Sequence, residues 1–307
     1  MTITPDWTRV LNALAAAGWT ARVVAADRMD QLRNRVAGVL ASGELPGPTA
    51  DHLRDEVAFA WPDTIRAPHA VVVAATPRPL TRATLAIGGE PHEIVVPPHY
   101  AGYHTVPDGL AAALATALAP SGHAAARFEP PLKTLAACSG LSRYGRNNIA
   151  YVPGLGSYFM LAACATDAPP PGDAWDEPLQ LDRCERCSAC LRACPSGAIR
   201  ADRFLLQTDR CLTSVNEDEA PLPDWVDPAW HHCAVGCLRC QQACPENAGV
   251  ELRIAPVETF DEAESAAILA ATPAQQLAVA TRDRLARCGL DYSPTLIARN
   301  LHALIGA

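Results

Sequence analysis

The stretch Cys184-Glu-Arg-Cys187-Ser-Ala-Cys190-Leu-Arg-Ala-Cys194-Pro195 is the most informative part of this sequence. Its spacing, C-x2-C-x2-C-x3-C-P, is typical of proteins that hold two [4Fe–4S] clusters, in which the fourth cysteine ligates the other cluster. Three thiolates on one tight loop can reach three irons of a single cubane, whereas the fourth begins a helix and points away. Proline suits the next position because the first turn of a helix needs no amide donor there.

A second motif, Cys237-Leu-Arg-Cys240-Gln-Gln-Ala-Cys244-Pro245, repeats the end of the first. The position three residues before Cys237 holds Ala234, so one ligand must come from elsewhere, and Cys211 and Cys233 are the candidates. One cluster is predicted to take Cys184, Cys187, Cys190 and Cys244, and the other Cys194, Cys237, Cys240 and either Cys211 or Cys233.

The placement of the twelve cysteines separates metal binding from its alternatives. Nine lie between residues 184 and 244, and such bunching indicates metal sites, whereas disulfide scaffolds spread their cysteines through the fold. Paired C-x2-C sequences also bind zinc, but the repeated x3-C-P ending favours iron–sulfur clusters. We expect the remaining Cys138, Cys164 and Cys288 to be core residues.

Composition and charge set the broad class of the protein. The 307-residue chain is 49% hydrophobic and 19% charged, which is ordinary for a globular protein with a substantial core. Its net charge of −8 makes nucleic acid an unexpected partner, although tRNA stays open as a substrate. The N-terminus lacks the layout of a signal peptide, and the most apolar run, residues 70–75, is too short to span a bilayer. We therefore expect a cytoplasmic protein with no membrane partner.

Hydrophobic periodicity predicts an alternation of helices and strands. Helices are expected at residues 7–17, 29–40, 109–119, 132–141, 259–271, 273–287 and 294–305, and strands at 70–75, 93–96 and 148–152. This order favours an α/β or α+β domain over about the first 170 residues. The stiff run Ala168-Pro-Pro-Pro-Gly172 suggests a boundary. The predicted domains are 1–172, a cluster domain at 173–252, and C-terminal helices at 253–307 that pack on the core.

Several short segments outside the first cysteine motif occur in one recognisable order. They are Tyr100-Ala-Gly-Tyr-His104, Gly140-Leu-Ser-Arg-Tyr-Gly145-Arg-Asn-Asn148, Gly156-Ser-Tyr-Phe-Met-Leu161, Arg210-Cys211-Leu-Thr213, Gly236-Cys237 and Arg299-Asn300. In these segments, and in its second cysteine motif, the sequence resembles the epoxyqueuosine reductases. These are cobalamin-dependent iron–sulfur enzymes related to reductive dehalogenases. The resemblance covers nearly the whole chain.

The resemblance implies an α+β fold with two modules and two kinds of cofactor. A nitroreductase-like α/β domain would carry base-off cobalamin, followed by a bacterial two-[4Fe–4S] ferredoxin-like module and short C-terminal helices. Cys211 rather than Cys233 would complete the second cluster, and the clusters would reduce the corrinoid to Co(I). The implied cobalamin contacts are His104, Tyr144, Asn148, Ser157, Tyr158, Thr213 and Ser214. Packing, turn formation and capping are the alternative roles of these residues.

One departure from the family concerns the proton donor. The family has an aspartate before a Glu-Lys-Pro-Leu segment, whereas the corresponding stretch here, residues 123–133, holds none. A reductive step that protonates its product needs an acid near the site, and Arg127, His123 and Glu129 are the candidates. Arg143 and Arg146 flank a glycine-rich turn and are candidates for binding a phosphate or amide group, with solvated surface as the alternative.

These observations together predict an oxidoreductase enzyme. Two [4Fe–4S] clusters would deliver electrons to cobalamin for reduction of a small organic molecule, with ferredoxin or flavodoxin as the external low-potential donor. The missing aspartate argues against the family's own substrate, so epoxyqueuosine reductase acting on tRNA with a relocated acid is the first alternative. The second is a non-catalytic electron-transfer or corrinoid-reducing partner protein.

Overall fold

The computed structural model describes residues 3–57 and 59–306, which fall into two compact units that are considered separately. The first comprises Met1–Pro77 and His104–Cys187, and the second Arg78–Tyr103 and Ser188–Ala307. This division differs from the predicted one because a hairpin from the first third of the chain belongs to the second unit. It also falls inside the first cysteine motif rather than at residue 172. The predicted outer limits, residues 1 and 307, lie outside the described part of the chain.

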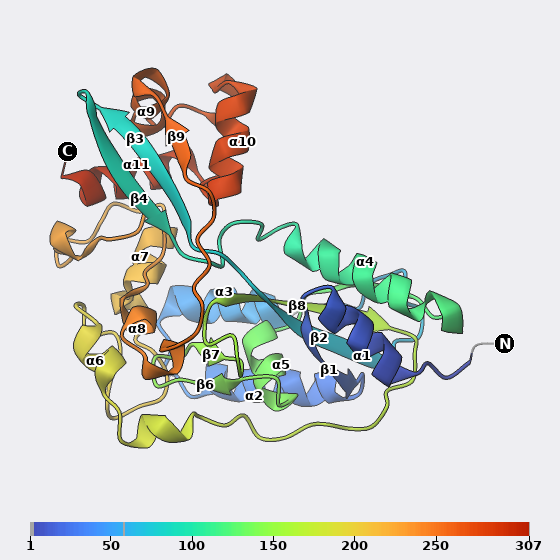
Figure 1. Ribbon diagram of the computed structural model, residues 1–307. Coiled ribbons are helices and arrows are strands. Elements are labelled where there is room, and N and C mark those ends of the chain that lie inside the picture. Colours follow the sequence, from blue (N-terminus) through green and yellow to red (C-terminus); the bar gives the residue numbers. More distant parts are fainter. Residues whose placement is uncertain (1–2, 58, 307) are drawn as a thin grey trace. The chain divides into compact units, whose positions relative to one another are not determined.

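A four-stranded sheet forms the centre of the first unit (Figure 1). Its order is β1-β2-β8-β5, and every neighbouring pair is antiparallel. The strands are β1 (Thr20–Ala25), β2 (Ala70–Pro77), β8 (Phe159–Thr166) and β5 (Ala125–Phe128). The first six residues of β2 are all buried, because helices cover both faces of the sheet. This explains why β2 is a continuous apolar run without alternation.

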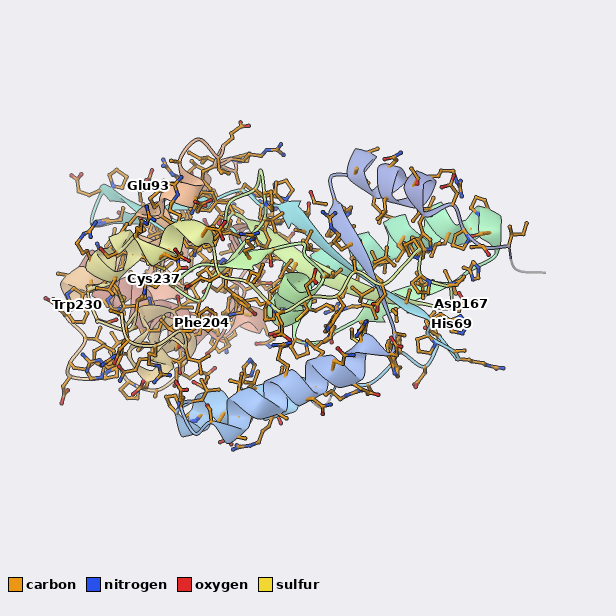
Figure 2. The ribbon with its side chains drawn as sticks, turned by 90° about the horizontal axis from the view of Figure 1, so that it is seen from below. His69, Glu93, Asp167, Phe204, Trp230 and Cys237 are labelled. Atoms are coloured by element: carbon orange, nitrogen blue, oxygen red, sulfur yellow. The ribbon has the colours of Figure 1, made fainter. Side chains whose placement is uncertain are left out.

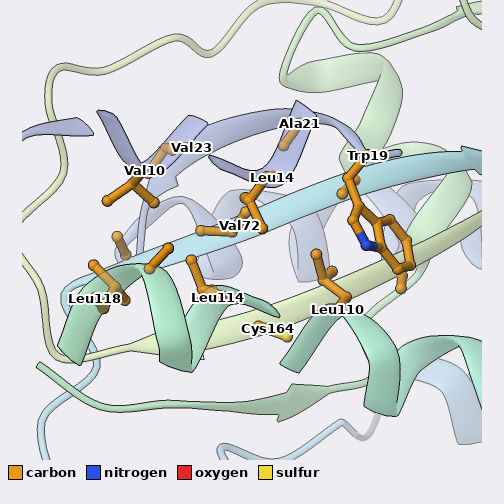
Figure 3. Close-up of a cluster of buried hydrophobic side chains, with 14 of the residues drawn as sticks. Val10, Leu14, Trp19, Ala21, Val23, Val72, Leu110, Leu114, Leu118 and Cys164 are labelled. Atoms are coloured by element: carbon orange, nitrogen blue, oxygen red, sulfur yellow. The ribbon is translucent and has the colours of Figure 1, made fainter. Parts of the chain in front are cut away.

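Helices α1 (Trp7–Ala16) and α4 (Val106–Leu118) cover one face of the sheet. Leu14 from α1 and Leu114 from α4 pack over Val72 of β2 (Figure 3). Both leucines are fully buried, and burying a leucine side chain contributes about 1.5–3 kcal/mol. This core is local to the first unit and fixes the sheet that carries the candidate acids.

The other face is covered by α2 (Arg28–Ala41) and α5 (Leu132–Cys138). Met29 and Leu32 from α2 join Leu135 from α5 in a second buried cluster. Helix α3 (Gly47–Val57) packs on α2, and β6 (Arg143–Tyr144) pairs with β7 (Ala150–Tyr151) in a two-stranded ribbon. The first unit therefore has a sheet between two helical layers.

The second unit is built on the hairpin of β3 (Thr81–Ile87) and β4 (Glu90–Val96). Strand β9 (Glu258–Phe260) pairs with β3 in parallel. Three helices share a buried cluster with this sheet: α9 (Glu262–Leu269), α10 (Val279–Cys288) and α11 (Pro294–Ile305). The cysteine segment adds the short helices α6 (Ala189–Ala193), α7 (Leu212–Glu217) and α8 (Arg239–Gln242).

The predicted elements are mostly confirmed, and the mixed helix and sheet architecture agrees with the predicted α+β class. Three predicted helices were wrong at their ends. The one at 273–287 begins only at Val279 of α10, after the separate 3-10 helix Ala274–Gln276. The one at 132–141 stops at Cys138 because Gly140 adopts a left-handed φ of +71°, and the one at 259–271 begins as strand β9. Strands β1, β3, β5, β6 and β8 and helices α3, α7 and α8 were missed. Among the described residues, no helix combines the length and apolarity that crossing a bilayer requires.

Candidate iron–sulfur site

Three predicted ligands of the second cluster lie near one another within the second unit. The thiolates of Cys211 and Cys194 lie near Cys237 and raise its pKa, which burial, the larger cause, brings to about 11. Cys194 likewise lies near Cys211, whose pKa burial raises. Cys237 also packs with Trp230 in a small hydrophobic cluster (Figure 2). Segments that are distant in sequence therefore bring these thiols near one another, while the described residues contain no group of three or more His, Cys, Asp or Glu side chains placed to hold a single metal ion.

Backbone amides point at two of these sulfurs. Cys211 is the N-cap of α7, and the amides of Thr213 and Ser214 hydrogen bond to its sulfur and lower its pKa, against the larger effect of burial. The Thr213 side chain contributes in the same direction. The Arg239 amide does the same for Cys237. Amide donors to sulfur stabilise a metal-bound thiolate. These residues are therefore suited to support Cys211 and Cys237 as cluster ligands by hydrogen bonding to their sulfurs.

The alternative ligand Cys233 has different surroundings. It is fully buried and clusters with Leu80 and Leu238. Burial raises the pKa of its thiol to about 12, with the neighbouring Cys237 as the next cause. A small apolar pocket is the usual environment of a structural cysteine. This placement favours Cys211 as the fourth ligand.

Two buried asparagines tie the cysteine loops together. Asn216 donates from Nδ2 to the carbonyl of Gly236 at 2.9 Å. Asn300 of α11 donates from Nδ2 to the carbonyls of Asn216 at 2.8 Å and Ala234 at 3.1 Å. Both asparagines are at most 1% exposed. Because Asn216 lies on the helix after Cys211 and Gly236 precedes Cys237, this amide network fixes the two ligand loops relative to each other.

Gly236 is also held by an aromatic ring. It has a left-handed φ of +65°, and a Cβ added there would lie 2.2 Å from the hydroxyl oxygen of Tyr100. Tyr100 is buried and donates its hydroxyl to the Glu217 carboxylate. Only glycine meets both the backbone and the space requirement at this position.

The four cysteines predicted for the other cluster are divided between the two units in sequence. Cys184 and Cys187 belong to the first unit, and Cys190 and Cys244 to the second. Within the second unit, α6, which contains Cys190, packs on α8, which ends two residues before Cys244. All twelve cysteines are among the described residues, and no disulfide is recorded among them. Cys138, Cys164 and Cys288 are at most 1% exposed, which confirms them as core residues.

The candidate proton donors do not form one group. His123 precedes β5, where its Nδ1 lies 3.3 Å from Oδ1 of Asp167. Glu129 follows β5 and pairs with Arg127, whose Nε donates to Oε1 at 2.9 Å. Arg127 also lies 3.5 Å from Asp108. Arg127 lies within β5 and pairs with Glu129, whereas His123 lies before the strand and contacts Asp167, so the candidates have separate partners.

The predicted cobalamin contacts in the first unit differ in exposure. Tyr144, Ser157 and Tyr158 are 7–9% exposed, and burial raises the pKa of Tyr144 to about 12. Asn148 is half-buried in a turn with φ +60°, and His104 is exposed, with its carbonyl accepting from Arg127. The buried three do not offer open surface to a corrinoid, whereas Asn148 and His104 do.

Sequence reasoning missed several residues that hold the site. It gave the two asparagines of the amide network no role and treated Arg146 as a surface candidate. In the structure Arg143 forms an exposed ion pair with Asp182, while the Arg146 amide donates to the Cys184 sulfur. An asparagine in a buried segment beside a cysteine motif was the available signal, because a buried amide needs partners.

Comparison with known proteins supports this site. Residues 183–247 match the family described as a 4Fe-4S double cluster binding domain. The chain is similar to epoxyqueuosine reductases. The epoxyqueuosine reductase of Yersinia pestis is 33% identical over 116 residues, which is 38% of this chain and 27% of that protein. That of Burkholderia pseudomallei is 32% identical over 133 residues, 41% of this chain and 32% of that protein.

Solved epoxyqueuosine reductases share the fold of this chain. The Streptococcus thermophilus structure covers 98% of this chain and 80% of its own, with a TM-score of 0.65 and 16% identity. Another epoxyqueuosine reductase, solved with an epoxyqueuosine-modified tRNA-Tyr stem loop, covers 97% of this chain and 80% of its own, with a TM-score of 0.67 and 18% identity. At such identities the likeness establishes the fold, and the sequence alignments span about a third or less of the curated relatives.

Proposed function

We propose that this chain is a two-[4Fe–4S] reductase that acts on epoxyqueuosine in tRNA. The observation that carries the proposal is that the curated relatives, aligned over 38–41% of this chain, are named epoxyqueuosine reductases. The match of residues 183–247 to a double-cluster family supports the electron-carrying part. An external low-potential protein such as ferredoxin or flavodoxin would supply the electrons.

The chain's own residues would hold the clusters and favour the thiolate form. The two ligand sets are Cys184, Cys187, Cys190 and Cys244, and Cys194, Cys211, Cys237 and Cys240. The clusters supply single electrons at low potential. Amides at the start of α7 and α8 stabilise two of the sulfurs, and the amide network keeps their loops in register.

Cobalamin is part of the proposal through the resemblance to epoxyqueuosine reductases. A bound corrinoid would supply a strongly reducing cobalt centre next to the substrate. His104 and Asn148 are the first-unit candidates with surface to meet it, whereas the burial of Tyr144, Ser157 and Tyr158 does not fit direct contact. Cobalt analysis of protein purified from cells supplied with cobalamin tests this part: about one cobalt per chain supports it, and none removes it.

A specific observation favours reduction of a small organic molecule as a second candidate. Residues 123–133 contain no aspartate, and their one acid, Glu129, is exposed and paired with Arg127. Glu129 is the residue we propose as the relocated acid if tRNA is the substrate, because it is a carboxyl group at a strand end. Glu129→Gln would then lower turnover while the iron content stays unchanged, and His123→Gln, at the far end of β5, would leave turnover unchanged.

The decisive test is restoration of queuosine to tRNA in a strain that lacks epoxyqueuosine reductase. The intact chain should restore it, and Cys237→Ala, which removes a cluster ligand, should not. If the intact chain accumulates with about eight irons per molecule and queuosine stays absent, the tRNA proposal is wrong and the small-molecule reading replaces it.

A further inference from the structure

The turn between β6 and β7 is rigid. The Gly145 amide donates to the carbonyl of Ile149 at 2.8 Å, and the Asn148 amide donates to that of Gly145 at 3.0 Å. A Cβ at Gly145 would lie 2.4 Å from Oδ1 of Asn147 and 2.6 Å from Cε2 of Tyr151. Asn147 is buried and donates from Nδ2 to the Tyr151 hydroxyl at 2.9 Å. The backbone position of Arg146 is therefore fixed on both sides.

Arg146 hydrogen bonds to Cys184 through both its backbone and its side chain. Its amide donates to the Cys184 sulfur at 3.3 Å, and its guanidinium Nη2 donates to the Cys184 carbonyl. Its Nε is buried and has no hydrogen-bond partner within the part of the chain that the structure describes. A cation whose Nε is desolvated therefore lies beside a predicted cluster ligand, and both belong to the first unit.

Arg143 at the other side of the turn provides the contrast. Its guanidinium Nη1 lies 2.9 Å from Oδ1 of Asp182, and the two side chains are 45% and 90% exposed. Water screens such a pair, so Arg143 has little influence on its surroundings. The two arginines differ in burial and in partner, although only two residues separate them.

We propose that Arg146 is a positioning residue that raises the reduction potential of the cluster ligated by Cys184. This inference rests on the proposed two-cluster centre. On reduction the [4Fe–4S] core accepts one electron from an external one-electron donor, and its charge falls from 2+ to 1+ with no bond broken and no proton moved. Hydrogen bonds to the sulfurs and a nearby cation stabilise the added negative charge, so they favour the reduced form.

The test is a potentiometric titration of the reconstituted full chain, followed by electron paramagnetic resonance. Arg146→Ala removes the cation and keeps the amide. It should lower the midpoint potential of one cluster by about 59 mV, which corresponds to a tenfold change in the equilibrium constant of a one-electron reduction. The midpoint potential of the other cluster should stay unchanged. Arg146→Lys keeps the charge and should give a smaller shift. Arg143→Ala is the matched control and should titrate as the unmodified protein does.

Several outcomes would overturn the inference. Unchanged potentials in Arg146→Ala, or a shift in Arg143→Ala as large as that in Arg146→Ala, would show that the Arg146 cation has no specific effect. If Arg146→Ala fails to assemble clusters, Arg146→Gln, which removes the charge but keeps a polar side chain, takes its place, and an unchanged potential in it refutes the role of the cation. Iron analysis of the unmodified chain separates the two proposals: protein without iron refutes the two-cluster centre itself, whereas protein with about eight irons and insensitive potentials refutes only the role of Arg146.

Discussion

The turn that holds Cys184 and the loops that hold Cys211 and Cys237 position cysteines by different means. In the first unit, one backbone turn presents Arg146, whose amide and guanidinium both contact Cys184. In the second unit, two buried asparagines join loops from separate parts of the sequence. In the first arrangement one arginine supplies both the amide and the side chain that contact the cysteine. In the second, buried amides join the loops, and the charge of Arg239 also lies near Cys237.

Both regions also depend on a glycine that a tyrosine ring covers. Gly145 faces Tyr151, and Gly236 faces Tyr100. Gly236 additionally requires a left-handed backbone, with φ +65°. Gly236 therefore requires glycine for both its backbone conformation and the space beside it, whereas Gly145 requires it for the space alone.

The largest expected effect concerns the choice of fourth ligand in the second region. Cys211→Ala should lose one cluster, so that iron falls from about eight to about four per chain, because no other thiol lies in its place. Cys233→Ala is the matched control and should keep about eight, since Cys233 lies in an apolar cluster. Iron and sulfide analysis after anaerobic reconstitution measures both. The reverse result would make Cys233 the ligand.

The two glycines give the next effect. Gly236→Ala should destabilise the protein by about 2–4 kcal/mol, from left-handed strain and from the clash with the Tyr100 ring. Gly145→Ala meets only a clash, so its cost should be about 1–3 kcal/mol. Anaerobic urea unfolding followed by circular dichroism compares them. A larger loss for Gly145→Ala would contradict the ranking of the two regions.

Removal of one amide tests the network of the second region. Asn300→Ala leaves the carbonyls of Asn216 and Ala234 without this donor, and the expected loss of stability is about 2–4 kcal/mol. The exposed Gln275→Ala should stay within about 0.5 kcal/mol. The same unfolding experiment applies. Similar losses of stability in the two variants would mean that the buried amide network contributes no more to stability than an exposed side chain does.

The smallest effect is expected at the surface of the first region. Asp182→Asn removes the partner of Arg143, and the exposure of both side chains limits the change in stability to about 0.5 kcal/mol. Thermal unfolding should barely distinguish this variant from the unmodified protein. A loss above about 1 kcal/mol would indicate that the turn relies on its surface ion pair as well as on its buried contacts.

The amino-acid sequence by itself determined the chemistry of this protein. The C-x2-C-x2-C-x3-C-P motif indicates clusters because ligand spacing on one loop is local, and the apolar run at β2 indicates a buried strand for the same reason. Helix α11 was predicted with its observed limits because its periodicity and its first-turn proline are also local signals.

Only the tertiary structure decided what surrounds each cysteine. Cys211 and Cys233 are equivalent as residue types, and they differ because one lies near Cys194 and the other near Leu80. Arg143 and Arg146 are likewise indistinguishable in sequence, yet one is solvated and the other contacts a predicted cluster ligand. Burial and hydrogen bonding depend on segments far apart in the chain, so no local pattern encodes them.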